Sequence, residues 1–275
     1  MRIAHLILAG VAAFAPALAT PVAAQEFQSH CIELAETTPG VYYASFGDTL
    51  AADEVRLNFV GHSTYLLETA GGLTAATDFT GFVGADVLPD IVTMNRAPSS
   101  HYTDNPDPRI PHVLRGWGEG SEPAEHYLDL EELVVRNVTT DIRSGFAGAV
   151  ENGNSIFVFE VAGLCIGHLG HIHHEPSDEQ YALLGRVDVV MAPVDGGLTV
   201  PTSVMIKILK RLRSSVVLPM HWFGRATLEQ FLDGMSEEFA VERVADNNIV
   251  VSLRTLPRQP TIYVLEPRFV DRAGP

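Results

Sequence analysis

Apolar and polar residues alternate in short runs along the first half of the chain, as they do in β-strands with one buried face. Residues 55–60 place Val, Leu and Phe against Arg and Asn, and a period of two is the pattern of a half-buried strand. Residues 64–69 and 73–77 flank Gly71 and Gly72, which predicts a hairpin. Further strands are predicted at residues 90–94, 132–138, 155–161 and 164–169.

The second half of the chain alternates predicted strands with predicted helices. Ser177 precedes a helical segment as its N-cap, with Glu179 close behind it. The amphipathic segment 201–212 has Pro in its first turn and Lys and Arg in its last, as helix ends prefer. The predicted helices are 177–184, 201–212 and 226–235, with strands at 187–192, 215–220 and from 249 onward. Strands followed by strand–helix alternation indicate an α/β fold.

The first 24 residues have the composition of an export signal. Arg2 gives a short positive start, residues 6–19 are apolar and rich in Ala, and residues 22–24 form a small-residue cleavage site. An uncleaved membrane anchor is the alternative, but Pro16 interrupts an apolar run that is short for a bilayer span. We expect a signal peptide at 1–24 and a mature protein in the periplasm or outside the cell, without stable membrane insertion.

Length and charge limit the domain count and the partners. The mature chain, residues 25–275, is long enough for one packed domain, and no repeat or change in composition divides it. A short helix is expected over 31–36 and a long polar loop over 95–126. The formal charge of −16 becomes −17 when Arg2 leaves with the signal. Because an acidic protein is poorly suited to a phosphate backbone, we exclude nucleic acid as a partner and expect a small-molecule substrate.

The two cysteines, Cys31 and Cys165, have two interpretations. An oxidising compartment would permit a disulfide between them. Cys165 lies between Leu164 and Ile166 in a predicted strand, however, where a buried thiol is as natural. Since the sequence does not give the distance between the two residues, both states stay open.

Histidines stand where two apolar strands end. His168 lies at the end of the strand at 164–169, and His171, His173 and His174 follow it; His221 follows the strand at 215–220. A strand end places a side chain on the rim of a sheet, where a rigid scaffold holds it. Neutral imidazole is the commonest protein ligand for zinc and similar metals. The pattern therefore predicts a metal site along one edge of a β-rich fold.

A series of short motifs follows the same order as in a known family. They are 59–68 (FVGHSTYLLE) with 76–79 (ATDF), 91–94 (IVTM) before 99–104 (SSHYTD), 168–171 (HLGH), 192–197 (APVDGG) and 219–221 (PMH). In this order they resemble the metallo-β-lactamase-fold superfamily, and more narrowly its branch that holds ascorbate-phosphate lactonase and N-acyl-phosphatidylethanolamine phospholipase D. The resemblance implies a single domain with a four-layer αββα sandwich, in which two mixed β-sheets are flanked by helices.

The metal-ligand motif departs from the pattern of that superfamily. The main ligand loop of relatives reads His-Xaa-His-Xaa-Asp-His, whereas residues 99–104 of this chain keep only His101 and carry Asp104 in the last position. His171 stands where relatives have a bridging Asp, and Asp141 stands where they often have a His. An intact two-metal site is therefore not implied, and one ion is expected rather than two.

The resemblance implies a single site around His101, His171 and His221. The candidate metal ligands are His101, His171, His221, Asp104, Asp141 and, from the His-rich tract, His173. Three imidazoles with one carboxylate or water suit Zn²⁺, although another divalent metal stays open. Zinc lowers the pKa of a bound water to about 7. Asp104 or Asp141, when not a ligand, would act as the general base or orient that water.

Several of these polar residues also have simpler interpretations. His62 is not a ligand in relatives, so we expect it to be a buried residue that forms hydrogen bonds. His168 is expected to support the ligands rather than to bind the metal. His173 is either a ligand or a solvated loop residue, and Asp104 and Asp141 are either site residues or caps of backbone amides in turns.

The motifs and the leader together predict an exported, metal-dependent hydrolase of a small ester, lactone or phosphodiester that acts through metal-bound hydroxide. Because the ligand loop is eroded, one alternative is a non-catalytic metal- or ligand-binding protein on the same fold. A third hypothesis is a fold that keeps no metal, since a fold does not establish an activity. The relative positions of His101, His171 and His221 distinguish these alternatives.

Overall fold

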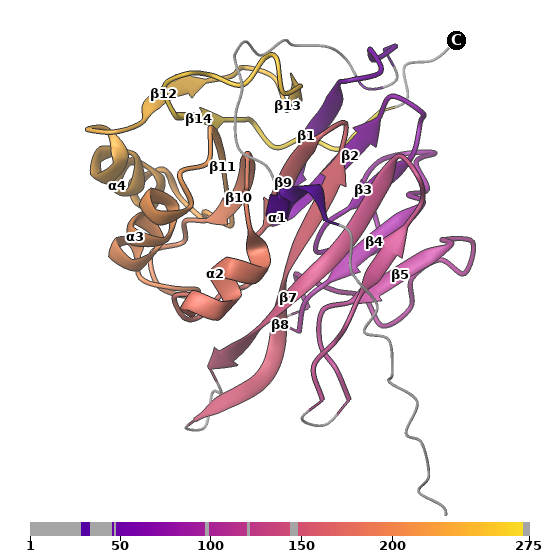
Figure 1. Ribbon diagram of the computed structural model, residues 1–275, viewed down its shortest axis with the longest axis horizontal. Coiled ribbons are helices and arrows are strands. Elements are labelled where there is room, and N and C mark those ends of the chain that lie inside the picture. The colour runs from indigo at the N-terminus through magenta and orange to yellow at the C-terminus, as the bar shows by residue number, and fades with distance from the viewer. Residues whose placement is uncertain are drawn as a thin grey trace, which may run out of the picture.

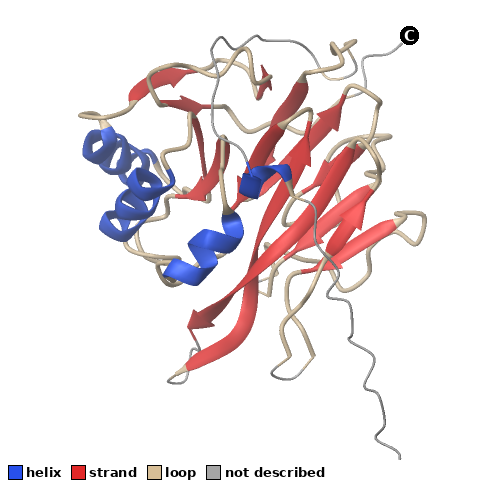
Figure 2. Ribbon diagram, in the orientation of Figure 1, coloured by secondary structure: helices blue, strands red, loops and turns tan. Residues whose placement is uncertain are grey.

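The computed structural model describes residues 29–33, 46, 48–96, 99–119, 122–143 and 148–271. The expected signal peptide at 1–24 and residues 34–36 of the first expected helix lie outside the described residues. The described chain forms two β-sheets with helices gathered on one side (Figures 1 and 2). None of the helices in the described part is long and apolar enough to cross a membrane.

The first sheet has six strands in the order β13-β1-β2-β3-β4-β5. These are β1 (Val55–Gly61), β2 (Thr64–Thr69), β3 (Thr74–Ala76), β4 (Ile91–Met94), β5 (His112–Arg115) and β13 (Asn248–Val251). The hairpin expected at Gly71 and Gly72 connects β2 and β3. Strand β5 lies within the range expected to be a loop. The prediction missed it because this short, half-exposed edge strand lacks a clear alternation, and among the described strands it pairs only with β4.

The second sheet has eight strands in the order β12-β14-β11-β10-β9-β8-β7-β6. These are β6 (Tyr127–Asp129), β7 (Leu133–Arg143), β8 (Ala149–Val161), β9 (Leu164–His168), β10 (Val189–Pro193), β11 (Val216–Met220), β12 (Ala240–Arg243) and β14 (Thr261–Val264). Strands β7 and β8 run on past the expected segments at 132–138 and 155–161, as a more polar two-stranded extension (Figure 1). Both sheets mix parallel and antiparallel pairs.

The main core lies between the two sheets. Phe59 of β1 stacks on Tyr65 of β2 with ring centroids 4.8 Å apart, and both pack in one buried cluster with Phe157 and Met191 of the second sheet. The Tyr65 hydroxyl donates to the carbonyl of Pro219 at 3.2 Å. A hydrogen bond therefore joins the sheets inside an apolar layer, close to the end of β11.

Three helices cover the outer face of the eight-stranded sheet, α2 (Asp178–Leu184), α3 (Thr202–Leu212) and α4 (Arg225–Met235). Ser177 is the N-cap of α2 as predicted, and its partner in the capping box is Gln180. Over the outer face of the six-stranded sheet, the described apolar cover comes from loop residues such as Phe79, Val83 and Ile110. The predicted α/β sandwich of two mixed sheets is confirmed.

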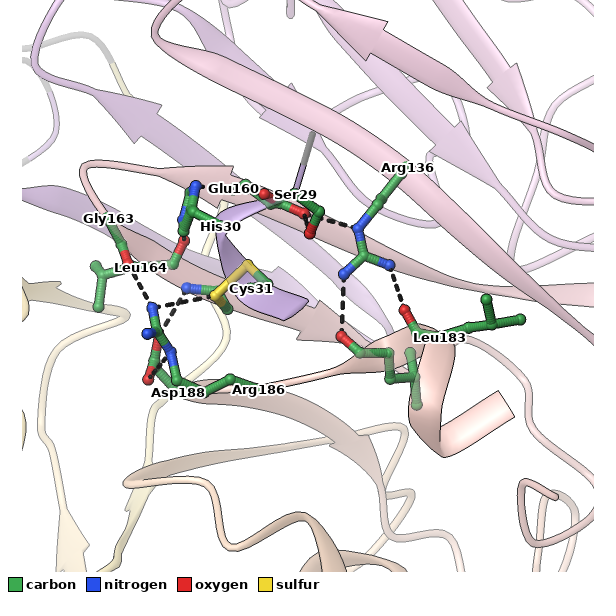
Figure 3. The surroundings of a disulfide bond; sticks show 12 residues. Ser29, His30, Cys31, Arg136, Glu160, Gly163, Leu164, Leu183, Arg186 and Asp188 are labelled. Atoms are coloured by element: carbon green, nitrogen blue, oxygen red, sulfur yellow. Dashed lines mark hydrogen bonds and ion pairs between the residues drawn. A yellow bond between two sulfur atoms is a disulfide. The ribbon is translucent and has the colours of Figure 1, made fainter. Parts of the chain in front are cut away.

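A disulfide fastens the short helix α1 (His30–Glu33) to the second sheet (Figure 3). It joins Cys31 to Cys165 of β9 across 134 residues, so of the two states left open by the sequence the structure has the bridge. Beside it, Glu160 accepts from Ser29 Oγ at 2.5 Å and from Arg136 Nε at 2.7 Å. This buried ion pair and the disulfide together hold the start of the described chain against β8 and β9.

Candidate metal site

Four imidazole rings meet where strands of both sheets end. His62 follows β1 and His101 lies between β4 and β5, while His171 follows β9 and His221 follows β11. The ring centroid of His101 lies 4.6 Å from that of His171 and 4.9 Å from that of His221, and the last two are 5.1 Å apart. The three histidines that the sequence assigned to one site are therefore brought together.

A buried carboxylate orients His101. The Nδ1 atom of His101 lies 2.7 Å from Asp78 Oδ2, and Asn95 Nδ2 donates to Asp78 Oδ1 at 2.9 Å. Burial raises the pKa of Asp78, but the charges of His101 and His168 and the hydrogen bonds from His101 and Asn95 outweigh it and lower the pKa to about 2. An ionised Asp78 holds the proton of His101 on Nδ1, which leaves a lone pair on Nε2.

A second carboxylate lies beside His221. The Nδ1 atom of His221 is 3.0 Å from Asp195 Oδ2. The ring is not aligned well enough for a hydrogen bond, yet a carboxylate at this distance still favours a proton on Nδ1. Asp195 also accepts from main-chain N–H groups of residues 197–199 and from the Thr199 hydroxyl. Burial raises the pKa of Asp195, but these hydrogen bonds and His221 hold it well below its usual range.

The two oriented rings face each other through their Nε2 atoms, which are 3.0 Å apart. Because Asp78 and Asp195 favour the tautomer with the proton on Nδ1 in the two neutral rings, a hydrogen bond between these Nε2 atoms would lack a proton. Two ligand nitrogens at about 2.0–2.1 Å from a tetrahedral Zn²⁺ stand about 3.3 Å from each other. The facing lone pairs of His101 and His221 therefore fit a shared cation.

His171 is oriented differently, by a chain of donors. The main-chain N–H of Arg143 donates to Nδ1 of His173 at 2.5 Å, so a neutral His173 carries its proton on Nε2. That Nε2 is 2.8 Å from Nδ1 of His171, whose own proton is then on Nε2. Burial, with nearby positive charges, lowers the pKa of His171 to about 3 and of His173 to about 4. Both rings are thus neutral near pH 7, and His171 presents a donor rather than a lone pair.

The two carboxylates expected from the sequence are not partners of these rings. Asp104 is exposed, and Asp141 Oδ1 accepts the main-chain N–H of Asn152 at 2.9 Å in the β7–β8 hairpin. Within the described residues, no hydrogen bond or ion pair joins either carboxylate to the histidine cluster. Asp78 and Asp195 take this place, and each comes two residues after a strand. The strand-end pattern that singled out the histidines would have found them too.

His168 and His62 differ in their hydrogen bonding, which the sequence did not suggest. His168 is fully buried; its Nε2 lies 2.8 Å from the Ser63 carbonyl, and its Nδ1 accepts from the main-chain N–H of Gly170. His62 was expected to form buried hydrogen bonds, but its buried Nε2 has no hydrogen-bond partner in the part of the chain that the structure describes. Burial, followed by the charges of His221 and His101, lowers the pKa of His62 to about 4.

Exposed apolar side chains flank the cluster. The ring centroid of Phe223 lies 5.4 Å from that of His62 and 5.1 Å from that of His221, yet 66% of the Phe223 surface is exposed. Leu198, in the loop whose amides hold Asp195, is 60% exposed. The histidine cluster is therefore a polar centre bordered by the apolar side chains of Phe223 and Leu198. Two cavities lie elsewhere, one of about 350 Å³ beside Glu160 and one of about 430 Å³ beside Asp90.

Comparisons with known proteins place the fold. A family model described as a beta-lactamase superfamily domain matches residues 56–221. Similar solved structures include a protein of Thermotoga maritima assigned as a Zn-dependent hydrolase of the metallo-β-lactamase superfamily. It is 22% identical with a TM-score of 0.54, and the match covers 78% of this chain and 100% of that chain. Another is Igni18, a metallo hydrolase of Ignicoccus hospitalis, with 18% identity, a TM-score of 0.51, and coverage of 67% and 91%. Among curated proteins there is no significant match.

Proposed function

Because the chain belongs to the β-lactamase superfamily, whose domain covers residues 56–221, we propose that it is an exported, zinc-dependent hydrolase of a small ester, lactone or phosphodiester. The observation that supports this most directly is the approach of the Nε2 atoms of His101 and His221 to 3.0 Å. The assignments of the two similar structures as a Zn-dependent hydrolase and a metallo hydrolase agree with it.

The residues of the cluster fit a single zinc ion. Imidazole nitrogens with carboxylates behind them are characteristic of zinc sites. Harder ions prefer oxygen ligands, which His101 and His221 do not offer. A zinc ion held there would polarise a substrate oxygen and lower the pKa of a coordinated water. Asp78 and Asp195 keep the two rings in the tautomer that binds metal.

The other residues around the cluster would act on the substrate. The Nε2–H of His171, fixed by His173, is available to donate to an oxygen that gains negative charge in the transition state. Phe223 and Leu198 would exclude water and contact an apolar part of the substrate. Of the carboxylates expected to transfer protons, Asp141 already binds a backbone amide and Asp104 is exposed, so we assign proton transfer to neither.

Export is supported by the disulfide. Disulfides persist in oxidising compartments and are rare in reducing ones, and Cys31 is bonded to Cys165. The sequence of residues 1–24 supports the same assignment, because it has the charge, apolar stretch and small-residue ending of a secretory signal. We therefore place the mature protein in the periplasm or outside the cell.

Metal analysis and a substrate panel test the proposal together. The purified mature protein should contain about one zinc per chain, and His101→Ala and His221→Ala should lose it while His112→Ala, on β5, keeps it. Turnover of esters, lactones or phosphodiesters should stop on chelation and return with zinc. Turnover that survives chelation would overturn the mechanism.

A second function is favoured by the erosion of the ligand loop. Ser99 and Thr103 stand where relatives carry ligand residues, so a non-catalytic zinc-binding protein is the competing candidate. Zinc retention in the wild type, with no turnover across the whole panel, would support this candidate instead.

A further inference from the structure

We propose that His62 is the third imidazole ligand of the site and that it compensates for the ligands missing from the 99–104 loop. The inference rests on the proposed function, because it presumes a metal ion between His101 and His221. In the resemblance described above, His62 has no such role, and Ser99 and Thr103 leave the loop with few donors. Two ligands would then come from the ends of β1 and β11, and the third from the loop between β4 and β5.

The backbone directs His62 towards the cluster. The pairing of β1 with β2 shifts register between Phe59 and Gly61, and such bulges commonly redirect a side chain next to a functional site. His62 follows with a φ of +54°, an unfavourable conformation for a non-Gly residue that persists only where the surroundings compensate. This unusual backbone therefore positions the His62 ring.

The side chain of His62 lacks a partner that a cation would supply. Its Nε2 is buried and has no hydrogen-bond partner among the described residues, which is unfavourable unless something else satisfies it. One ring nitrogen from each of His62, His101 and His221 lies within 4.8 Å of the other two. The ring centroid of His62 is 4.2 Å from that of His221 and 5.1 Å from that of His101. One ion between these rings would bind one nitrogen of each, and through Nε2 it would also satisfy the unpartnered atom of His62.

His171 is the less suitable third ligand. Among the described residues it is not a member of this close group of nitrogens. Coordination through its Nε2 would also move its proton to Nδ1, and His173 would then need its own proton on the nitrogen that accepts from Arg143. Ligation by His62, His101 and His221 preserves that hydrogen bond. It also leaves a fourth position open, as catalytic zinc sites require.

Zinc affinity and coordination, measured without reference to activity, test this assignment. The mature protein is stripped with a chelator and reloaded; its affinity is measured against a chromophoric competitor, and X-ray absorption of the bound zinc counts the imidazoles. His62→Asn is the main variant, because Asn tolerates a left-handed backbone, and His62→Gly is a second with the same freedom. His171→Gln and His112→Asn are the matched controls.

We expect three coordinated imidazoles in the wild type and in both controls, and two in His62→Asn. The zinc affinity of His62→Asn should be lower by at least about 100-fold, since the loss of a residue that only supports a ligand already costs about 10–100-fold. Unchanged affinity and three imidazoles in the folded His62 variants would overturn the role of His62 alone. A count that falls in His171→Gln and not in His62→Gly would transfer the role to His171. Wild-type affinity in His101→Asn, or no zinc in the wild type, would instead overturn the proposed function.

Discussion

The main-chain N–H of His221 donates to the carbonyl of His62 at 2.6 Å, and both residues have a left-handed backbone, with φ of +57° and +54°. His62 directly follows a strand of the six-stranded sheet and His221 directly follows a strand of the eight-stranded sheet. The hydrogen bond therefore joins the ends of strands from the two sheets, at residues that carry two of the clustered rings. Strained backbone at two adjoining strand ends is typical of functional sites, where the rest of the fold compensates for its cost.

Asp78→Asn should weaken zinc binding without removing a ligand. The amide can no longer hold the proton of His101 on Nδ1 as strongly as the carboxylate that lies 2.7 Å away. We expect a loss of affinity of roughly 10–100-fold, measured by competition with a chelator. Asp90→Asn is the matched control, because Asp90 is also a strand-end carboxylate but binds Thr74. Equal losses in both variants would show a general effect on folding.

Asp104→Ala and Asp141→Asn should leave zinc affinity within about 2-fold of the wild type, since surface changes away from a site are usually small. Asp104 is exposed, and Asp141 binds the amide of Asn152 rather than a ring of the cluster. The same competition assay measures both variants. A loss of affinity comparable to that of His101→Ala in either one would restore that carboxylate to the metal site.

Removal of the disulfide should lower stability strongly. The bond between Cys31 and Cys165 closes 134 residues of chain, and a loop of that length corresponds to about 3–5 kcal/mol of unfolding free energy. Urea unfolding of the wild type and of the Cys31→Ala, Cys165→Ala double variant measures the difference. A reductant should destabilise the wild type and leave the double variant unchanged. Equal midpoints for the oxidised wild type and the double variant would contradict the expectation.

Acid should destabilise the metal-free protein through its buried histidines. Burial lowers the pKa of His168, and the opposing effects of Asp78 and Ser63 only partly offset it. The unfolded chain, with a His pKa of about 6.5, then binds more protons than the folded one as the pH falls. Stability is fully present above about pH 6.5 and declines below it, by up to about 1.4 kcal/mol per pH unit for each such His.

Urea unfolding of chelated protein between about pH 7.5 and pH 5.5 measures this decline. His168→Gln retains a donor for the Ser63 carbonyl but cannot titrate, so its pH dependence should be shallower by about one proton. The same slope in the wild type and in His168→Gln would show that His168 does not contribute.

The sheets could be predicted from the sequence because their signals are local. Alternation in segments such as residues 55–60, and the Ser177 cap before α2, depend on neighbouring residues alone. Strand β5 was not predicted, since an edge strand that is half-exposed has no distinct apolar face. Strands β7 and β8 extend further than predicted because each completes the other's hydrogen bonds beyond the apolar segment.

The candidate site was only partly predictable for a different reason. His171 and His221 could be predicted from strand ends, and His101 joined them through the order of motifs that carries the family resemblance. The environment of each ring, however, depends on contacts across long stretches of chain, such as Asn95 with Asp78 or Arg143 with His173. The orphan nitrogen of His62 is of this kind, because only the packing of two sheets shows which polar atoms are left without partners.

Two of the four clustered rings are carried by each sheet. A folding intermediate in which only one sheet had formed would therefore offer half of the cluster, and its affinity for a divalent ion would be that of a pair of histidines. We therefore expect the ion to bind late in folding. Once bound, it would cross-link the two sheets, in addition to the covalent cross-link between Cys31 and Cys165.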